Sequence, residues 1–276
     1  MIEDPADTQD APGSQDPGTP RVAAFFDVDN TIIRGASAAH LARALYQREF
    51  FGIRDLWSLG LHHLRYMTLG ENRRQINTVR SRALSIVAGH TVAEIVAIGE
   101  EVYDQVLELR IFPGTKRLLD EHVAAGHEVW LVSATPIEIG TMIARRLGAN
   151  GALGSVAESE GGVYTGALVG DMMHGRHKAA GVAELAARRG IDLDESFAYG
   201  DSMNDLTMMQ TVGHPCAINP EPRLRRHAAQ VGWPVREFRG RPARAARSGA
   251  KTLSLAGAVW AGALVVRQIG RTIRGR

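Results

Sequence analysis

Cysteine is nearly absent from this chain of 276 residues, in which Cys216 is the only one. A single cysteine excludes an internal disulfide framework and is typical of a reducing compartment. Residues 1–20 contain five acids, no lysine or arginine and no apolar run. Because a secretory signal needs a basic and an apolar region, we expect a cytoplasmic protein. We also expect residues 1–20 to be disordered, since they have little apolar surface to bury.

Charge is distributed unevenly along the chain. Residues 236–276 contain ten Lys/Arg and one acid, so they carry +9, and the total of +2 leaves −7 for residues 1–235. Such a basic tail attracts anionic membranes or nucleic acid. Apolar residues make up 45% of the chain, which excludes global disorder and allows one large α/β domain with an inserted subdomain.

Short apolar runs alternate with helical patterns in most of the chain. Strands are predicted at 22–26, 128–132, 197–199 and 212–218, with a hairpin near 161–166. Helices are predicted at 115–125, 136–147 and 178–189, each ending at a glycine. This alternation predicts a Rossmann-like, mainly parallel sheet with helices on both faces.

Residues 36–109 interrupt this alternation with apolar residues at helical spacing, which predict about four helices. Thr91 and Glu94 form a capping-box pattern for the last of them, expected to run to about residue 109. The predicted organisation is therefore a disordered tail (1–20), an α/β core (21–35 and 110–238), a helical insertion (36–109) and a basic tail (239–276) with an apolar helix at 252–267.

Acidic side chains follow two of the predicted strands. Asp27 and Asp29 end the first strand, and Asp201 and Asp205 follow the strand at 197–199. Because the carboxyl ends of parallel strands meet at one edge of a sheet, these acids should lie together. Crowded carboxylates need a cation or a proton between them, and Mg²⁺ is the hard cation that such ligands prefer.

Phosphate binding is the chemistry that the remaining groups fit best. The Ser133 hydroxyl, the Lys178 ammonium and the backbone N–H near Ala134 could bind phosphate oxygens. Asp27 would then be free to attack phosphorus. Asp29 could protonate the leaving alcohol and later activate water.

The motifs resemble those of a known family. The segment DVDNT at 27–31, then Ser133, Lys178 and GDSMND at 200–205 are similar in order to the four motifs of the haloacid dehalogenase phosphatase superfamily. The insertion at 36–109 resembles its type I cap, and residues 131–138 resemble the phosphoserine-phosphatase-like subfamily IB. The resemblance implies an Mg²⁺-dependent phosphomonoester hydrolase that acts through an aspartyl-phosphate.

The resemblance also implies roles for the acids. Asp27 would be the nucleophile and a metal ligand, and Asp29 the acid/base that also gives the metal its backbone carbonyl. Asp201 would be the third protein ligand, and Asp205 would orient a metal-bound water.

Substrate contacts follow from the same resemblance. Ser133, Ala134 and Lys178 would hold the phosphoryl group, and Asn204 would lie near the substrate. One departure concerns residues 32–39, which contain no acid, whereas phosphoserine phosphatases have a glutamate there for the substrate amino group. We therefore expect a different small phosphomonoester, or a phospholipid head group, as substrate.

Two other functions remain open from the sequence. A phosphotransferase would use the same aspartyl-phosphate and pass the group to an alcohol instead of water. A membrane-docked protein without activity could use the same scaffold, although the intact acids argue against it.

The basic tail contains an apolar stretch at 253–266. As a helix it would be about 21 Å long, short of a hydrocarbon core of about 30 Å. It could dock on protein, or it could enter one leaflet with flanking arginines at the head groups. We expect peripheral association with the inner face of the cell membrane, whereas a nucleic-acid partner would leave the apolar stretch without a role.

The tail prediction can be tested with lipid vesicles. The full chain should sediment with anionic vesicles more than with neutral ones, because each Lys or Arg near the surface contributes about 1 kcal/mol. A protein shortened to residues 1–239 should stay in the supernatant. Equal sedimentation of the two proteins would exclude the tail as the membrane anchor.

Overall fold

The computed structural model describes residues 21–48 and 87–239. All of these residues belong to one compact unit that ends at Arg239. The acidic tail at 1–20, the middle of the insertion at 49–86 and the basic tail at 240–276 lie outside the described residues, so the predictions for them stay predictions. Among the residues that are described, no helix is long and apolar enough to cross a membrane.

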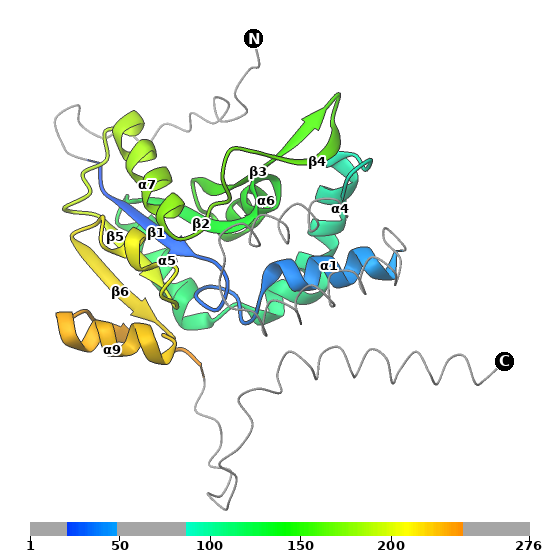
Figure 1. Ribbon diagram of the computed structural model, residues 1–276. Helices are drawn as coiled ribbons and strands as arrows, with labels where there is room; N and C mark the ends of the chain where they lie inside the picture. Colours follow the sequence, from blue (N-terminus) through cyan, green and yellow to red (C-terminus); the bar gives the residue numbers. More distant parts are fainter. Residues whose placement is uncertain (1–20, 49–86, 240–276) are drawn as a thin grey trace, which may run out of the picture. The chain divides into compact units, whose positions relative to one another are not determined.

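A seven-stranded sheet forms the centre of the molecule, in the order β4-β3-β2-β1-β5-β6-β7 (Figure 1). All neighbouring strands are parallel except the β3–β4 pair. The predicted fold class is confirmed. The strands are β1 (Ala23–Asp27), β2 (Glu128–Pro136), β3 (Gly151–Glu160), β4 (Val163–Val169), β5 (Phe197–Gly200), β6 (His214–Ile218) and β7 (Val235–Arg236).

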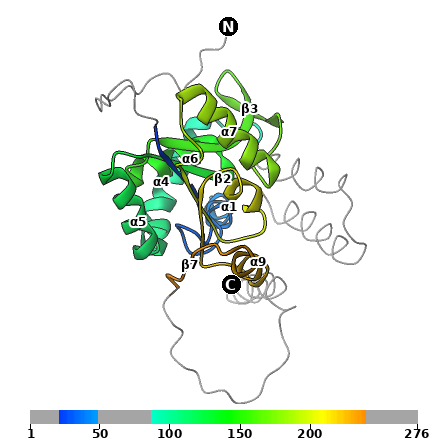
Figure 2. The same cartoon turned by 90° about the vertical axis from the view of Figure 1, so that its left-hand side faces the viewer.

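Helices cover both faces of the sheet. Side chains along β1 point alternately to the two faces, and because those at 23–26 are apolar, each face needs a cover of helices. Phe26 packs in a core with α5 (Pro113–Ala124) and α6 (Ile137–Leu147). Phe25 packs on the opposite face with α7 (Arg176–Arg189), α8 (Leu206–Met209) and α9 (Pro222–Val231). Figure 2 shows α5 on one side of the sheet and α7 and α9 on the other. The two faces thus carry separate apolar cores.

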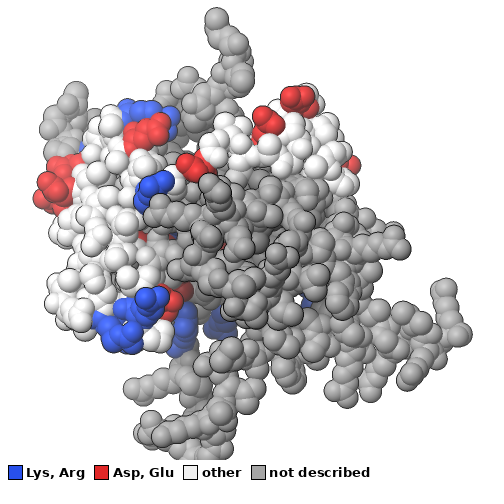
Figure 3. Space-filling view, viewed as in Figure 1, with Lys and Arg blue, Asp and Glu red and all other residues white. Residues whose placement is uncertain are grey.

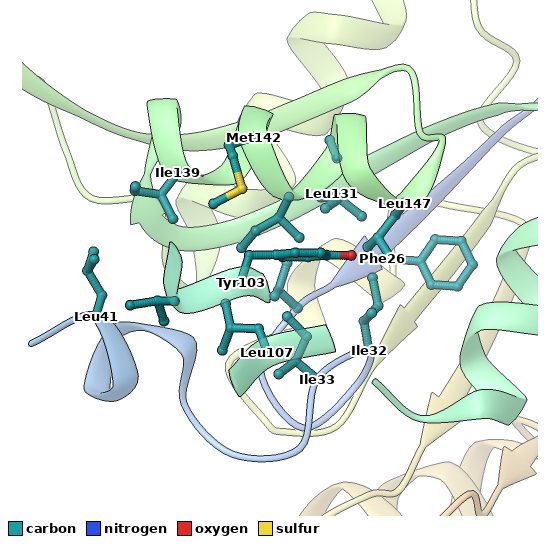
Figure 4. Close-up of a cluster of buried hydrophobic side chains, with 14 of the residues drawn as sticks. Phe26, Ile32, Ile33, Leu41, Tyr103, Leu107, Leu131, Ile139, Met142 and Leu147 are labelled. Atoms are coloured by element: carbon teal, nitrogen blue, oxygen red, sulfur yellow. The ribbon is translucent and has the colours of Figure 1, made fainter. Parts of the chain in front are cut away.

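The described parts of the insertion are helical. They comprise α1 (Ser37–Gln47), α4 (Val92–Val102), a π-helical turn (Tyr103–Leu107) and a 3₁₀ turn (Glu108–Arg110). Leu41, Tyr103 and Leu107 pack toward Ile139 and Met142 of α6 (Figure 4). The insertion therefore shares a continuous apolar core with the sheet. The division into core and cap stays a prediction, since residues 49–86 are not described.

Two neighbouring chain segments connect the insertion to the sheet. Ile33 and Ile111 form an antiparallel bridge, and the backbone N–H of Arg34 donates to the carbonyl of Arg110 at 2.9 Å. The N–H of Phe112 donates to the carbonyl of Ile32 at 2.8 Å. The segment that enters the insertion and the segment that leaves it are thus hydrogen-bonded to each other next to the end of β1.

Several predicted boundaries differ from the structure. The helix expected to reach residue 109 leaves α geometry at Val102, and the strand expected at 128–132 continues to Pro136. Strand β3 was not predicted because its sequence, GALGSVAESE, is poor in the β-branched and aromatic residues that mark strands. Helix α9 was not predicted either, although Pro222 at its first turn and Gly232 after its end are typical boundary signals.

Helix α9 gives the surface a local positive charge. Its three arginines, Arg223, Arg225 and Arg226, are exposed. Figure 3 shows Lys and Arg side chains gathered over α9 at the lower left, while acids lie over the β3–β4 hairpin at the upper right. The charge separation predicted between body and tail is thus accompanied by a second one within the body itself.

A buried histidine connects α5 to the sheet. His122 is 6% exposed, and its Nε2 lies 2.7 Å from the hydroxyl of Tyr199 on β5. Its Nδ1 lies 2.8 Å from Nδ1 of His127. Burial, and then the neighbouring His127, lowers the pKa of His122 to about 4. The ring is therefore neutral in the folded protein at pH 7.

This histidine should make stability depend on pH. In the unfolded chain His122 takes up its proton near pH 6.5, whereas the folded protein resists protonation until about pH 4. Stability should therefore fall as the pH drops through this window, by up to about 3 kcal/mol. Urea unfolding at pH 7 and pH 5 would measure it. The His122→Gln variant should show a smaller loss between these pH values, and an unchanged loss would exclude His122 as the cause.

Candidate active site

Three buried charged side chains meet at the carboxyl edge of the sheet. Asp27 ends β1, Lys178 lies in the first turn of α7, and Asp205 immediately precedes α8. Nζ of Lys178 donates to Oδ1 of Asp27 at 2.5 Å and to Oδ1 of Asp205 at 2.7 Å. All three are at least nine-tenths buried. Such burial is tolerable only because the charges pair with one another.

The acids outnumber this single ammonium. One carboxylate oxygen from each of Asp27, Asp201 and Asp205 can lie within 4.8 Å of the others. Burial, and then Asp205, raises the pKa of Asp27 well above its usual range. The same two causes raise the pKa of Asp201 to about 7. Burial acts against the charge of Lys178, but Asp27 and Asp205 hold its pKa above the ordinary value.

The donor set fits a hard divalent cation. Three carboxylates with one ammonium leave an excess of negative charge. A bound cation would neutralise this charge, and without one the acids reduce it by binding protons. Oxygen ligands alone, without imidazole or thiolate, favour Mg²⁺ over zinc. The cluster therefore meets the chemical requirements of a magnesium site.

The loop after β5 is built around Asp205. Oδ2 of Asp205 accepts hydrogen bonds from the N–H of Ser202 at 3.2 Å and from its hydroxyl at 3.0 Å. A Cβ at Gly200 would lie 2.5 Å from Cβ of Asp205, so only glycine leaves room for this carboxylate. Asn204, predicted to lie near the substrate, is exposed on the same loop.

The carboxylate of Asp29 is bound to the start of α1. Its Oδ1 accepts from the N–H of Ser37 at 2.8 Å and from the Ser37 hydroxyl at 2.6 Å. Ser37 is the first residue of α1, where helix geometry favours a negative charge. Asp29 is not part of the cluster of three acids, and the metal role that the sequence implied for its backbone carbonyl stays a prediction.

A chain of hydroxyl groups connects Asp29 to Ser133. The hydroxyl of Thr135 lies 3.4 Å from that of Ser37 and 2.9 Å from that of Ser133. Ser133 and Thr135 share one face of β2 because they are two residues apart, and both are buried. Between them, Ala134 accepts a hydrogen bond from the Ser155 hydroxyl through its carbonyl at 2.8 Å.

Sequence reasoning found the acids, the lysine and Ser133 but missed three supporting polar residues. Thr135 could have been found from its period-two spacing to Ser133. Ser37 and Asn219 carried no such local signal. Asn219 is fully buried, and its amide donates to the carbonyl of Asn30 at 3.2 Å.

The sequence is similar to a known family and to named proteins. The sequence model of the haloacid dehalogenase-like hydrolase family matches residues 24–210. A protein named phosphoserine phosphatase SerB1 from Mycobacterium tuberculosis is 47% identical over 218 residues, which are 79% of this chain and 71% of that protein.

Solved structures show the same fold. A Bordetella pertussis protein of unknown function is 28% identical, with a TM-score of 0.70 over 80% of this chain and 100% of that one. A phospho-aspartyl intermediate analogue of phosphoserine phosphatase has a TM-score of 0.53 at 19% identity over 80% of this chain and 94% of that one. At that identity the likeness concerns the fold alone.

These matches identify the class of protein. The chain belongs to the haloacid dehalogenase-like hydrolase family. The chain is therefore a hydrolase of this family, and relatives of it are named phosphoserine phosphatase and probable phosphatase. The predicted family resemblance is confirmed.

Proposed function

We propose that this enzyme hydrolyses a small phosphomonoester through an aspartyl-phosphate on Asp27, with Mg²⁺ as its metal. The observation that carries this proposal is the buried cluster of Asp27, Lys178 and Asp205 at the sheet edge, with Asp201 in ligand range. A phosphoryl group carries negative charge, so a site for it needs cations beside the attacking carboxylate.

The metal would be held by Asp27 and Asp201, with the backbone carbonyl of Asp29, and Asp205 would orient a metal water. Bound there, Mg²⁺ would neutralise phosphate charge and align the group with the attacking carboxylate. Lys178 already fixes Oδ1 of Asp27, which orients the nucleophile before substrate arrives. Ser133, supported by Thr135, would donate to a phosphate oxygen, with the Ala134 backbone beside it.

The reaction divides between the two acids of the first motif. A carboxylate oxygen of Asp27 bonds to phosphorus while the bond from phosphorus to the alcohol oxygen breaks, and Asp29 gives that oxygen a proton. Water then attacks phosphorus, its proton passes to Asp29, and the bond between Asp27 and phosphorus breaks. Inorganic phosphate leaves and both acids return to their first state.

The segment that leads from β1 into the insertion supports a substrate without an ammonium group. Residues 32–39 offer no carboxylate, and Arg34 stacks over the Phe112 ring at 5.3 Å from its centroid. A small phosphomonoester or a phospholipid head group fits this setting, and the latter would agree with a membrane-associated tail. Release of phosphate in water without an added alcohol would exclude obligatory phosphotransfer.

Substitution of Asp27 and substitution of Asp29 should have different effects on the reaction. Asp27→Asn should abolish both turnover and the trapping of a phosphoenzyme, because the nucleophile is lost. Asp29→Asn should still form phosphoenzyme from an ester with a good leaving group but hydrolyse it slowly. Acid quenching with labelled substrate would measure the intermediate, and Asp120→Asn on the exposed face of α5 is the matched control. Normal turnover in Asp27→Asn would refute the nucleophile assignment.

Phosphoserine should have little advantage as a substrate. With no acid to meet its ammonium, its kcat/KM should stay within about a hundredfold of that for glycerol phosphate, or about 2.7 kcal/mol in transition-state binding. Steady-state kinetics with both esters would test this. A larger preference for phosphoserine would show that an ammonium site exists elsewhere in the enzyme.

A further inference from the structure

The segment after β7 contacts the candidate active site. Glu237 pairs with Arg225 of α9, and the ring of Phe238 lies so close to Gly114 that a Cβ there would approach it to 2.1 Å. The next residue, Arg239, has its Nη2 3.8 Å from Oδ2 of Asp201. A guanidinium from outside the four motifs thus stands next to a candidate metal ligand.

Asn219 fixes the backbone that carries this arginine. Its Oδ1 accepts from the N–H of Phe238 at 2.7 Å and from the N–H of Arg239 at 3.0 Å, while its amide donates to the carbonyl of Asn30. Asn219 has a φ of 47°, a conformation that asparagine tolerates better than most residues. One buried side chain therefore connects Arg239 to the loop that follows the nucleophile.

The contact between Arg239 and Asp201 adds little to stability. The arginine side chain is 48% exposed, and an exposed pair at 3.8 Å contributes at most about 1 kcal/mol. Within the described residues Asp201 is the only charged partner of this guanidinium. A cation in the cluster would share the charge of Asp201 and weaken its hold on Arg239, leaving a half-exposed guanidinium available to another anion.

We infer that Arg239, positioned by Asn219, binds a second anionic group on the alcohol part of the substrate. The inference rests on the proposed phosphomonoesterase function and narrows its substrates to esters that carry a carboxylate or a further phosphate near the phosphoryl group. An arginine fork suits either group, since it donates two parallel hydrogen bonds.

The test compares two esters of the same carbon skeleton on the full-length enzyme with Mg²⁺. 3-Phosphoglycerate carries a carboxylate where glycerol 3-phosphate carries a neutral hydroxymethyl group. The wild type should favour 3-phosphoglycerate in kcat/KM by about tenfold, mainly through KM. Arg239→Gln should remove this preference, Arg239→Lys should restore part of it, and Asn219→Gly should reduce it.

The matched control is Arg225→Gln, which loosens the same segment at Glu237 without touching the cluster and should keep the preference. An unchanged preference in Arg239→Gln would overturn the inference, and so would a wild type that hydrolyses both esters equally well. In both cases phosphate release shows that the proposed function stands. If the wild type releases phosphate from no phosphomonoester, the proposed function fails and the inference fails with it.

Discussion

The crowding of carboxylates at one edge of a parallel sheet is the constraint on which the rest of this structure depends. Asp27 ends β1, Asp201 and Asp205 lie in the loop after the neighbouring strand β5, and Lys178 is the one ammonium within reach in the described chain. Their burial raises the pKa of Asp27 and Asp201, which expresses the same excess of negative charge. A bound divalent cation would relieve this excess by neutralising the acids, and it would also offset the negative charge of a phosphoryl group beside them.

Uncharged groups keep this strained arrangement in place. Ser37 and Thr135 connect Asp29 to Ser133 through hydroxyls, and Asn219 joins three backbone segments with one amide. Such supporting contacts matter because a reacting geometry must be held within a fraction of an ångström. The site therefore extends beyond the four motifs into α1, β2 and the segment after β7.

Elements that depend on local sequence patterns were predicted well, whereas elements that depend on contacts between distant parts of the chain were not. Strands β1 and β5 and helices α5 and α6 were predicted to within a few residues, since their apolar pattern is local. Strand β3 was missed because pairing with β2, and not its own composition, makes it a strand. The helix after Thr91 was predicted at its start, where the capping box is formed, but not at its end, where a π-helical turn follows from Tyr103 to Leu107.

The sequence by itself determined which acids, hydroxyl and lysine gather at the sheet edge, because each follows a strand or begins a helix that local pattern reveals. Tertiary structure alone decided the contacts of the Asp29 carboxylate, which accepts hydrogen bonds from both the Oγ and the backbone N–H of Ser37. It also decided that Asn219 reaches Asn30, 189 residues earlier in the chain, and that Arg239 meets Asp201. Contacts over such separations leave no periodic trace in sequence, because they arise only when distant segments are packed against each other.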